Sequence, residues 1–331
     1  MSELFIWIGV LLISLFILIK SSDYFTDSAE KIGIWLGIPA FFIGVTIVAI
    51  GTSLPELISS IIAVLSNSSE IVIGNVLGSN IANIFLILGI AGIIARKELK
   101  ISRNLLHVDL PFLLGTCFLL AIMIWDGKFT FFEGILSLVV LIIYSFYLIK
   151  SREKPEKEVR KQLRGVKGEL ANYKIKKIKP RKKLPIKIWI ILFISIIFIY
   201  LGAKYTIESV IRLSDLLNIG KEIIAVSVVA LGTSLPELAV TFSAAKKGKP
   251  EIAVGNILGS NIFNILAVMG IPALFGVLVI PAHILAFTLP VMIIATLMFL
   301  FITLNKEITK WEGWLLFIFY ILFVVKLFNL F

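Results

Sequence analysis

Apolar runs long enough to cross a membrane recur along the whole chain. Runs without any charged residue include 5–19, 135–149, 188–201 and 284–304. A helix that spans a bilayer needs about 20 mostly apolar residues, so these runs predict membrane helices rather than the core of a soluble domain. Together with similar runs they predict ten spans, at 5–35, 40–65, 71–95, 105–125, 131–149, 187–215, 221–246, 252–278, 281–304 and 310–330.

The composition also favours an all-α membrane protein. Hydrophobic residues make up 59% of the chain and charged residues 16%, and the mean hydropathy is +1.02. Soluble domains are typically about 45–50% apolar and about 25% charged. The first apolar run leads directly into others and has no small-residue cleavage site. We therefore expect it to be a retained span and not a signal peptide.

The net charge of +11 arises in one segment. Between 150 and 187 the chain has 16 Lys or Arg but only 4 Asp or Glu. Tyr173 is the only aromatic residue before the next apolar run, which argues against nucleic-acid binding. Basic segments between spans usually remain in the cytoplasm. We expect a cytoplasmic loop over 150–186, able to attract anionic lipid headgroups, between a first half, 1–149, and a second half, 187–331.

The two halves repeat each other. Residues 41–90 align with 222–271 without a gap at an offset of 181, and 25 of 50 positions are identical. With five spans per half, the second half enters the membrane from the opposite side. This predicts two inverted-topology five-helix repeats whose site lies near the midplane where they meet. Basic loops follow spans 3, 5, 7 and 9, so the same count places both termini outside the cell.

The motif GTSLPEL occurs once in each half and places an acid at membrane depth. An ionisable residue there is costly and indicates a functional site. Pro55 in the first copy has no N–H, so it should break the helix and free carbonyl oxygens beside the acid. Such oxygens, with hydroxyls and a carboxylate, suit a hard cation. The residues that share one helix face in each copy are Ala49, Thr52, Ser53 and Glu56, then Ala230, Thr233, Ser234 and Glu237.

A second repeated motif, GN-x-x-GSN-I-x-N, adds a polar stripe to an otherwise apolar helix. The stripe accompanies the glutamate motif twice, which favours contact with an ion or a pore over simple helix packing. The glycines of the same motif have GxxxG spacing and indicate close helix packing instead. The stripe residues are Asn75, Ser79 and Asn83 in the first half, and Asn256, Ser260 and Asn264 in the second.

The charge of the two glutamates and the oxygen ligands beside them point to cation transport. Two buried carboxylates carry a charge of −2, which one divalent cation, two monovalent cations or two protons could neutralise. A site that different cations occupy in turn is what antiport requires. Oxygen ligands suit Ca²⁺ or Na⁺ rather than Zn²⁺ or Cu⁺.

The chain has one cysteine, Cys117, and no HExxH or GxSxG motif, so we expect neither an enzyme nor a cofactor. A cation channel is the alternative class.

The doubled GTSLPE motif, each copy followed by the Asn/Ser motif, resembles the two α-repeats of the cation/calcium exchanger superfamily. It is most similar to the prokaryotic sodium/calcium exchanger branch, and the resemblance covers nearly the whole chain. It implies ten helices in inverted repeats that exchange entering Na⁺ for leaving Ca²⁺ by alternating access across the cytoplasmic membrane. We expect the monomer to be the functional unit.

The resemblance also implies roles for individual residues. Glu56 and Glu237 would hold Ca²⁺ together with the carbonyl oxygens of Thr52 and Thr233. The Na⁺ sites would lie around Ala49, Ser53, Ser79, Ala230, Ser234 and Ser260.

Two neutral residues separate this chain from some members of the superfamily. Asn83 and Asn264 stand where those members have an acid, so the central site carries less charge and the number of Na⁺ ions stays open. The proton/calcium branch typically has an acid in these helices. Its absence here favours Na⁺ over H⁺ as the counter-ion, and a Ca²⁺/H⁺ or other divalent-cation exchanger of the same fold is the alternative.

Overall fold

The computed structural model describes residues 2–36, 49–95, 99–100, 109–147, 185–246, 248, 250–305 and 307–328. Within these ranges the chain is almost entirely helical, as the apolar runs predict. The predicted basic loop lies outside the described residues apart from its last two positions, and so do the start of the second span and the start of the fourth.

Each of the ten predicted spans contains a described helix. The α-helices are Ser2–Leu36 (α1), Ala49–Thr52 (α3), Leu54–Leu65 (α4), Glu70–Ile81 (α5), Gly89–Ile94 (α6), Leu110–Met123 (α7), Phe131–Tyr147, Ile186–Leu217 (α9), Lys221–Ile224 (α10), Ala230–Thr233 (α11), Leu235–Lys246 (α12), Pro250–Phe263 (α13), Met269–Ala273 (α14), Leu289–Thr303 (α15) and Lys310–Leu327 (α16). The π-helical segments are Ala82–Leu88 (η2), Ala225–Val229 (η4), Asn264–Val268 (η5) and Ile284–Thr288 (η6).

Within the described ranges, six helical stretches are long and apolar enough to cross a membrane. They are Glu3–Phe25, Glu70–Ile94, Ile186–Leu217, Lys221–Lys246, Ala253–Ala273 and Ile284–Thr303. The other predicted spans correspond to α4, α7, the helix Phe131–Tyr147 and α16, which are shorter in the described residues or carry more charge.

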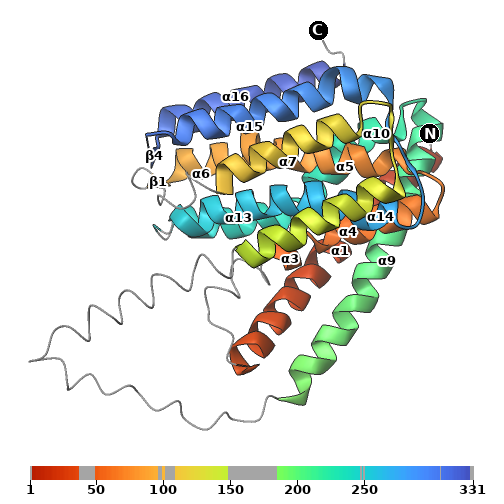
Figure 1. Cartoon of the computed structure of the whole chain (residues 1–331). Helices are drawn as coiled ribbons and strands as arrows, with labels where there is room; N and C mark the ends of the chain where they lie inside the picture. The colour runs from red at the N-terminus through yellow and green to blue at the C-terminus, as the bar shows by residue number, and fades with distance from the viewer. Residues whose placement is uncertain are drawn as a thin grey trace, which may run out of the picture.

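Helices α1 and α9 lie side by side, and their lower ends extend away from the rest of the bundle (Figure 1). Gly202 permits this close approach, because a Cβ atom at this position would lie 2.8 Å from the main-chain nitrogen of Leu18. A hydrogen bond also joins the pair, from the hydroxyl of Thr206 to that of Ser14 at 3.0 Å. The two halves of the sequence are therefore in contact along their first helices.

Two short antiparallel ribbons, which the sequence does not predict, also join the halves. Strand β1 (Leu99–Lys100) pairs with β4 (Glu307–Ile308), and β2 (Lys128–Phe129) pairs with β3 (Leu278–Val279). Each ribbon contains one strand from each half. Two-residue strands have no periodicity that could be recognised in a sequence, and they form only because tertiary packing brings the loops together.

The helices that follow two of these strands begin with the same cap. The main-chain N–H of Thr309 donates to the Glu312 carboxylate at 2.7 Å, at the start of α16. The main-chain N–H of Thr130 donates to the Glu133 carboxylate at 2.6 Å, before the helix Phe131–Tyr147. Both contacts satisfy a donor at a helix start, as in a capping box.

Glycines let the last helix of each half pack against the other half. A Cβ atom on Gly313 in α16 would lie 2.7 Å from the carbonyl oxygen of Gly89 in α6. A Cβ atom on Gly134 would lie 2.9 Å from the carbonyl oxygen of Gly270 in α14. The halves are therefore interlocked, with each end helix held by the opposite half.

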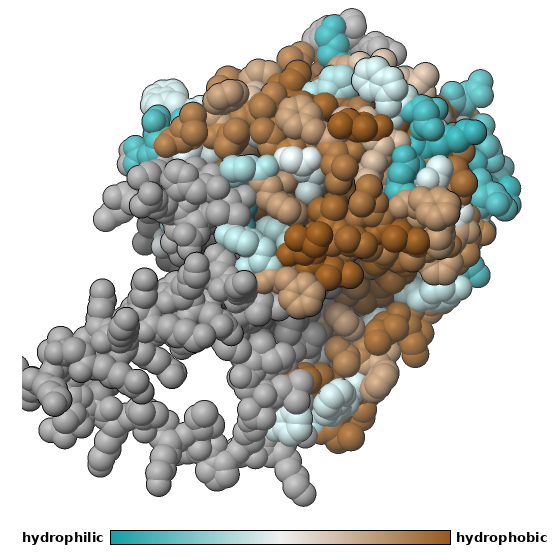
Figure 2. Space-filling view, in the orientation of Figure 1, coloured by the Kyte–Doolittle hydropathy of each residue, from teal (hydrophilic) through white to brown (hydrophobic). Residues whose placement is uncertain are grey.

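Apolar side chains cover the flank of the bundle. Figure 2 shows a broad hydrophobic face, with hydrophilic residues gathered toward its ends. Large exposed apolar side chains of the described residues include Phe132, Ile122 and Phe146, which are 79%, 74% and 68% exposed. A soluble monomer rarely exposes so much contiguous apolar surface, so this flank fits a lipid environment.

We predict that Gly313→Ala lowers the midpoint of thermal unfolding in detergent. The added Cβ would press on the backbone of α6, and overpacking typically costs about 1–3 kcal/mol. Gly115→Ala in α7 is the matched control, because a Cβ there meets none of the described atoms within 4 Å. Equal unfolding midpoints for the two variants would contradict the close packing of α6 and α16.

Candidate cation site

Both GTSLPEL segments form a helix that is interrupted just before its proline. Ser53 separates α3 from α4 with φ −89° and ψ 10°, and Ser234 separates α11 from α12 with φ −83° and ψ 6°. The break occurs because Pro55 and Pro236 supply no N–H to the preceding turn. The interruption predicted from the sequence is therefore present in both copies, directly beside the two glutamates.

Each glutamate accepts a hydrogen bond from the serine at the opposite break. The hydroxyl of Ser53 donates to Oε1 of Glu237 at 3.1 Å. The hydroxyl of Ser234 donates to Oε1 of Glu56 at 3.3 Å. All four side chains are at most 1% exposed. Residues 181 positions apart in sequence thus form a single buried cluster.

A second serine reaches each carboxylate from the Asn/Ser stripe. The hydroxyl of Ser79 in α5 lies 3.4 Å from Oε1 of Glu56 and 3.5 Å from the carbonyl oxygen of Ala230. The hydroxyl of Ser260 in α13 donates to Oε1 of Glu237 at 3.3 Å. The structure therefore brings most of the predicted residues into direct contact.

The second oxygen of each carboxylate has no hydrogen-bond partner among the described residues. This holds for Oε2 of Glu56 and Oε2 of Glu237, and none of the described basic residues forms an ion pair with either group. Buried charges are normally paired or coordinate a metal, because desolvation without compensation is expensive. The two free carboxylate oxygens are therefore ready ligands for a hard cation.

Asn75 and Asn256 support the glutamates from behind. The side-chain amide of Asn75 lies 3.4 Å from the main-chain oxygen of Glu56, and that of Asn256 lies 3.4 Å from the main-chain oxygen of Glu237. Thr233 donates to Oδ1 of Asn75 at 3.4 Å. The amide nitrogens of these two asparagines therefore contact the backbone that carries the acids, and ion contact by their side-chain oxygens stays a prediction.

Asn83 and Asn264 lie in the π-helical segments η2 and η5, four residues beyond Ser79 and Ser260. Their amide nitrogens bond to Asn261 and Asn80, at 2.8 Å and 3.1 Å. Their Oδ1 atoms have no hydrogen-bond partner among the described residues. Isolated π-helical turns occur frequently at functional sites.

The sequence analysis did not single out Asn80 and Asn261. Both belong to the GSN triplet, which recurs at the same offset of 181 as the glutamates. That recurrence could have identified them. They lie one position after the serines of the stripe, and the four-residue spacing used to define the stripe leaves them out.

The remaining predicted ligands lie at the ends of the short helices α3 and α11. Thr52 ends α3 and Thr233 ends α11, both buried, and ion contact by their carbonyl oxygens stays a prediction. Ala49 begins α3, and its side chain lies outside the described set. Among the described residues no group of three or more His, Cys, Asp or Glu side chains occurs, so the acidic charge of this site is confined to the glutamate pair.

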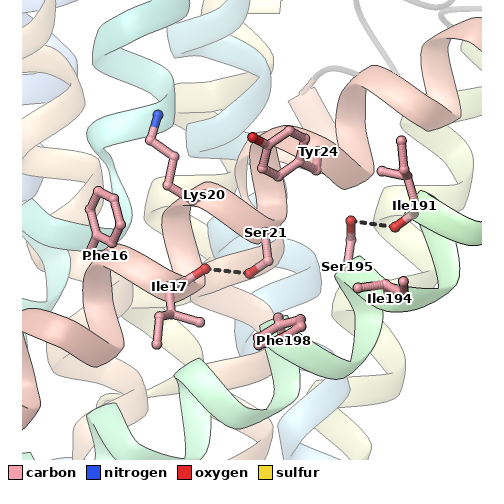
Figure 3. A pocket seen from close by; sticks show the side chains of 9 residues that line it. All are labelled: Phe16, Ile17, Lys20, Ser21, Tyr24, Ile191, Ile194, Ser195 and Phe198. Atoms are coloured by element: carbon pink, nitrogen blue, oxygen red, sulfur yellow. Dashed lines mark hydrogen bonds between the residues drawn. The ribbon is translucent and has the colours of Figure 1, made fainter.

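A separate cleft opens between α1 and α9 (Figure 3). Its volume is about 380 Å³, and apolar side chains such as Phe16, Ile194 and Phe198 line most of it. The hydroxyls of Ser21 and Ser195 bond to main-chain carbonyls of their own helices and not to each other. None of the predicted site residues lines this cleft, so it is not the cation site.

The fold and the site define a class of protein: a polytopic helical membrane protein with a buried cluster of oxygen atoms of the kind that suits a hard cation. The family model described as "Sodium/calcium exchanger protein" matches residues 6–150 and again residues 187–329. The chain belongs to the sodium/calcium exchanger family, which confirms the resemblance inferred from the repeated motifs.

Similar proteins cover almost the whole chain. Sodium/calcium exchanger MaX1 of Methanosarcina acetivorans is 38% identical over 96% of this chain and 97% of its own length. Inner membrane protein YrbG of Escherichia coli is 33% identical over 80% of this chain and 79% of its own. A solved structure of the sodium-calcium exchanger NCX_Mj, soaked with Na⁺ and Sr²⁺, superimposes with a TM-score of 0.64 at 30% identity, covering 97% of this chain and 98% of that one.

We predict that Glu56→Gln and Glu237→Gln each abolish Ca²⁺ binding to the purified protein in titration calorimetry, because each removes half of the buried charge. The protein should remain folded, since Gln keeps the shape and an Oε1 acceptor for the serine hydroxyls. Glu70→Gln is the control, because Glu70 pairs with Lys221 at a partly exposed position outside the site. Undiminished Ca²⁺ binding by either glutamate variant would remove that residue from the site.

Proposed function

We propose that this protein is a secondary active antiporter that exchanges Na⁺ for Ca²⁺ across the cytoplasmic membrane by alternating access. The observation that carries the proposal is the pair of buried glutamates. In each, serines bond one carboxylate oxygen, and the other oxygen has no hydrogen-bond partner in the part of the chain that the structure describes. Membership of the sodium/calcium exchanger family and the names of the similar proteins support the choice of ions.

The charge of the pair explains why transport would be coupled. Two carboxylates in a low-dielectric interior repel each other strongly unless cations neutralise them. One Ca²⁺ neutralises the pair, and two Na⁺ ions do so equally well. Because the same oxygens serve both ions, binding of one excludes the other. Loaded with either ion, the site would change its exposure from one side of the membrane to the other. This yields exchange without any chemical step or cofactor.

The architecture we infer is ten spans in two inverted repeats, formed by residues 1–149 and 187–331. Paired features support it. The ribbons and the glycine contacts each occur twice and join the two halves. The last helix of each half begins with the same cap. Ribbon β1–β4 joins the loop after span 3 to the loop after span 9. Ribbon β2–β3 joins the loops after spans 4 and 8, which the span count places on the opposite membrane face.

We infer that the basic loop over 150–186 faces the cytoplasm, next to anionic lipid headgroups, and that both termini lie outside. The loop charges support this orientation through the preference of Lys and Arg for the cytoplasmic side. We also infer a functional monomer, because both halves of the candidate site belong to the same chain and bond to each other.

We predict that an outward-directed Na⁺ gradient drives ⁴⁵Ca²⁺ uptake into proteoliposomes. A proton gradient of equal size, at equal Na⁺ on both sides, should drive no uptake. The reason is that the Asn/Ser stripes contain no acid that could carry a proton beside the glutamate pair. Uptake with the proton gradient alone would replace this function with Ca²⁺/H⁺ exchange. Single-channel currents in planar bilayers would replace it with a channel.

We also predict the orientation from thiol labelling. Cys117 is buried and is the only cysteine, so Cys117→Ala gives a background without thiols. In that background, Asp126→Cys should react with a membrane-impermeant maleimide in intact cells, and Gly165→Cys should react only after permeabilisation. The reverse pattern would invert the topology and leave the cation site unaffected.

A further inference from the structure

We propose that Asn80 and Asn261 are positioning residues, which hold the amides of Asn264 and Asn83 so that the oxygens of those amides are available to the transported cation. This inference rests on the proposed function. The four asparagines are at most 1% exposed, and they come from both halves of the chain.

The hydrogen bonds form a crossed pattern between the halves. The amide nitrogen of Asn83 donates to Oδ1 of Asn261 at 2.8 Å, and that of Asn264 donates to Oδ1 of Asn80 at 3.1 Å. Asn80 and Asn261 also bond to each other's backbone. Nδ2 of Asn80 lies 3.4 Å from the main-chain oxygen of Asn261, and Nδ2 of Asn261 lies 3.5 Å from that of Asn80.

These contacts engage both the oxygen and the nitrogen of the Asn80 and Asn261 side-chain amides. Each Oδ1 accepts a bond from the other half, and each Nδ2 donates to the other half. In both side chains the oxygen already accepts a hydrogen bond from the protein. Their role is therefore different from that of Asn83 and Asn264, whose Oδ1 atoms are buried and have no partner among the described residues.

The crossed pattern fixes which way two amides face. Rotation about the terminal torsion of asparagine is broad and roughly two-fold, so an unrestrained amide can present either its oxygen or its NH₂ group. An NH₂ group is a donor with positive hydrogens and cannot bind a cation. Because Asn80 and Asn261 accept the NH₂ groups, the oxygens of Asn264 and Asn83 point away from them and have no hydrogen-bond partner among the described residues.

The location suits such a role. Asn83 lies four residues beyond Ser79, and Ser79 is within hydrogen-bond distance of Glu56. Asn264 has the same relation to Ser260, which donates to Glu237. The free amide oxygens are thus about one helical turn from the serines that bond the two carboxylates.

The test compares Asn80→Ala in three backgrounds, by the Kd for Ca²⁺ measured by titration calorimetry with CaCl₂ in Na⁺-free detergent. In the natural background the Kd should rise about 10–100-fold, the range typical of lost support behind a metal ligand. In the Asn264→Asp background, Asn80→Ala should raise the Kd much less than in the natural background, because a carboxylate presents an oxygen in either orientation. In the Asn83→Asp background the full rise should return, because Asn83 is held by Asn261.

Asn261→Ala should show the mirror pattern, with relief by Asn83→Asp and none by Asn264→Asp. If the Ala variants do not fold, as judged by size-exclusion chromatography, Asn80→Ser and Asn261→Ser provide the same comparison with a shorter acceptor. A merely structural role for either residue would weaken Ca²⁺ binding equally in every background.

The outcomes separate this inference from the proposed function. If the natural protein binds and exchanges Ca²⁺ but the loss in Asn80→Ala is equal in all backgrounds, or absent, the positioning role is wrong and the antiport proposal stands. If the natural protein binds no Ca²⁺, both are wrong. Crossed relief in the two series establishes the positioning role.

Discussion

Two carboxylates lie buried in the interior of a membrane protein, with serine hydroxyls beside them and none of the described basic residues paired to them. Such an arrangement is unfavourable unless positive charge enters the site. The surrounding structure reflects this constraint. The proline breaks lie next to the acids, and asparagine amides support the backbone that carries them. The side-chain oxygens of Asn83, Asn256 and Asn264 have no hydrogen-bond partner among the described residues.

The serines at the helix breaks also link the two halves of the chain. Ser53 belongs to the first half and bonds to the acid of the second, and Ser234 does the reverse. Neither half could form this site alone, because each acid would lose its serine from the opposite break. The ribbons and the glycine contacts hold the halves in the alignment that these bonds require.

Much of the fold and site follows from local sequence features. Apolar runs locate the helices because a membrane requires long apolar stretches with satisfied backbone groups. Pro55 and Pro236 predict the breaks because proline lacks a donor whatever its surroundings. Glu56 and Glu237 stand out because an acid at membrane depth is costly. The repeat at an offset of 181 predicts that these features occur in pairs.

The sequence by itself therefore determined the helices, the breaks, the two acids and the family. Only the tertiary structure decided which groups face each other across the halves. It directed the amides of Asn75 and Asn256 to the glutamate backbone and connected Asn80 and Asn261 to Asn264 and Asn83. It also formed the two ribbons. Helical spacing specifies which residues share a face of one helix, but the partner of that face depends on how separate helices pack.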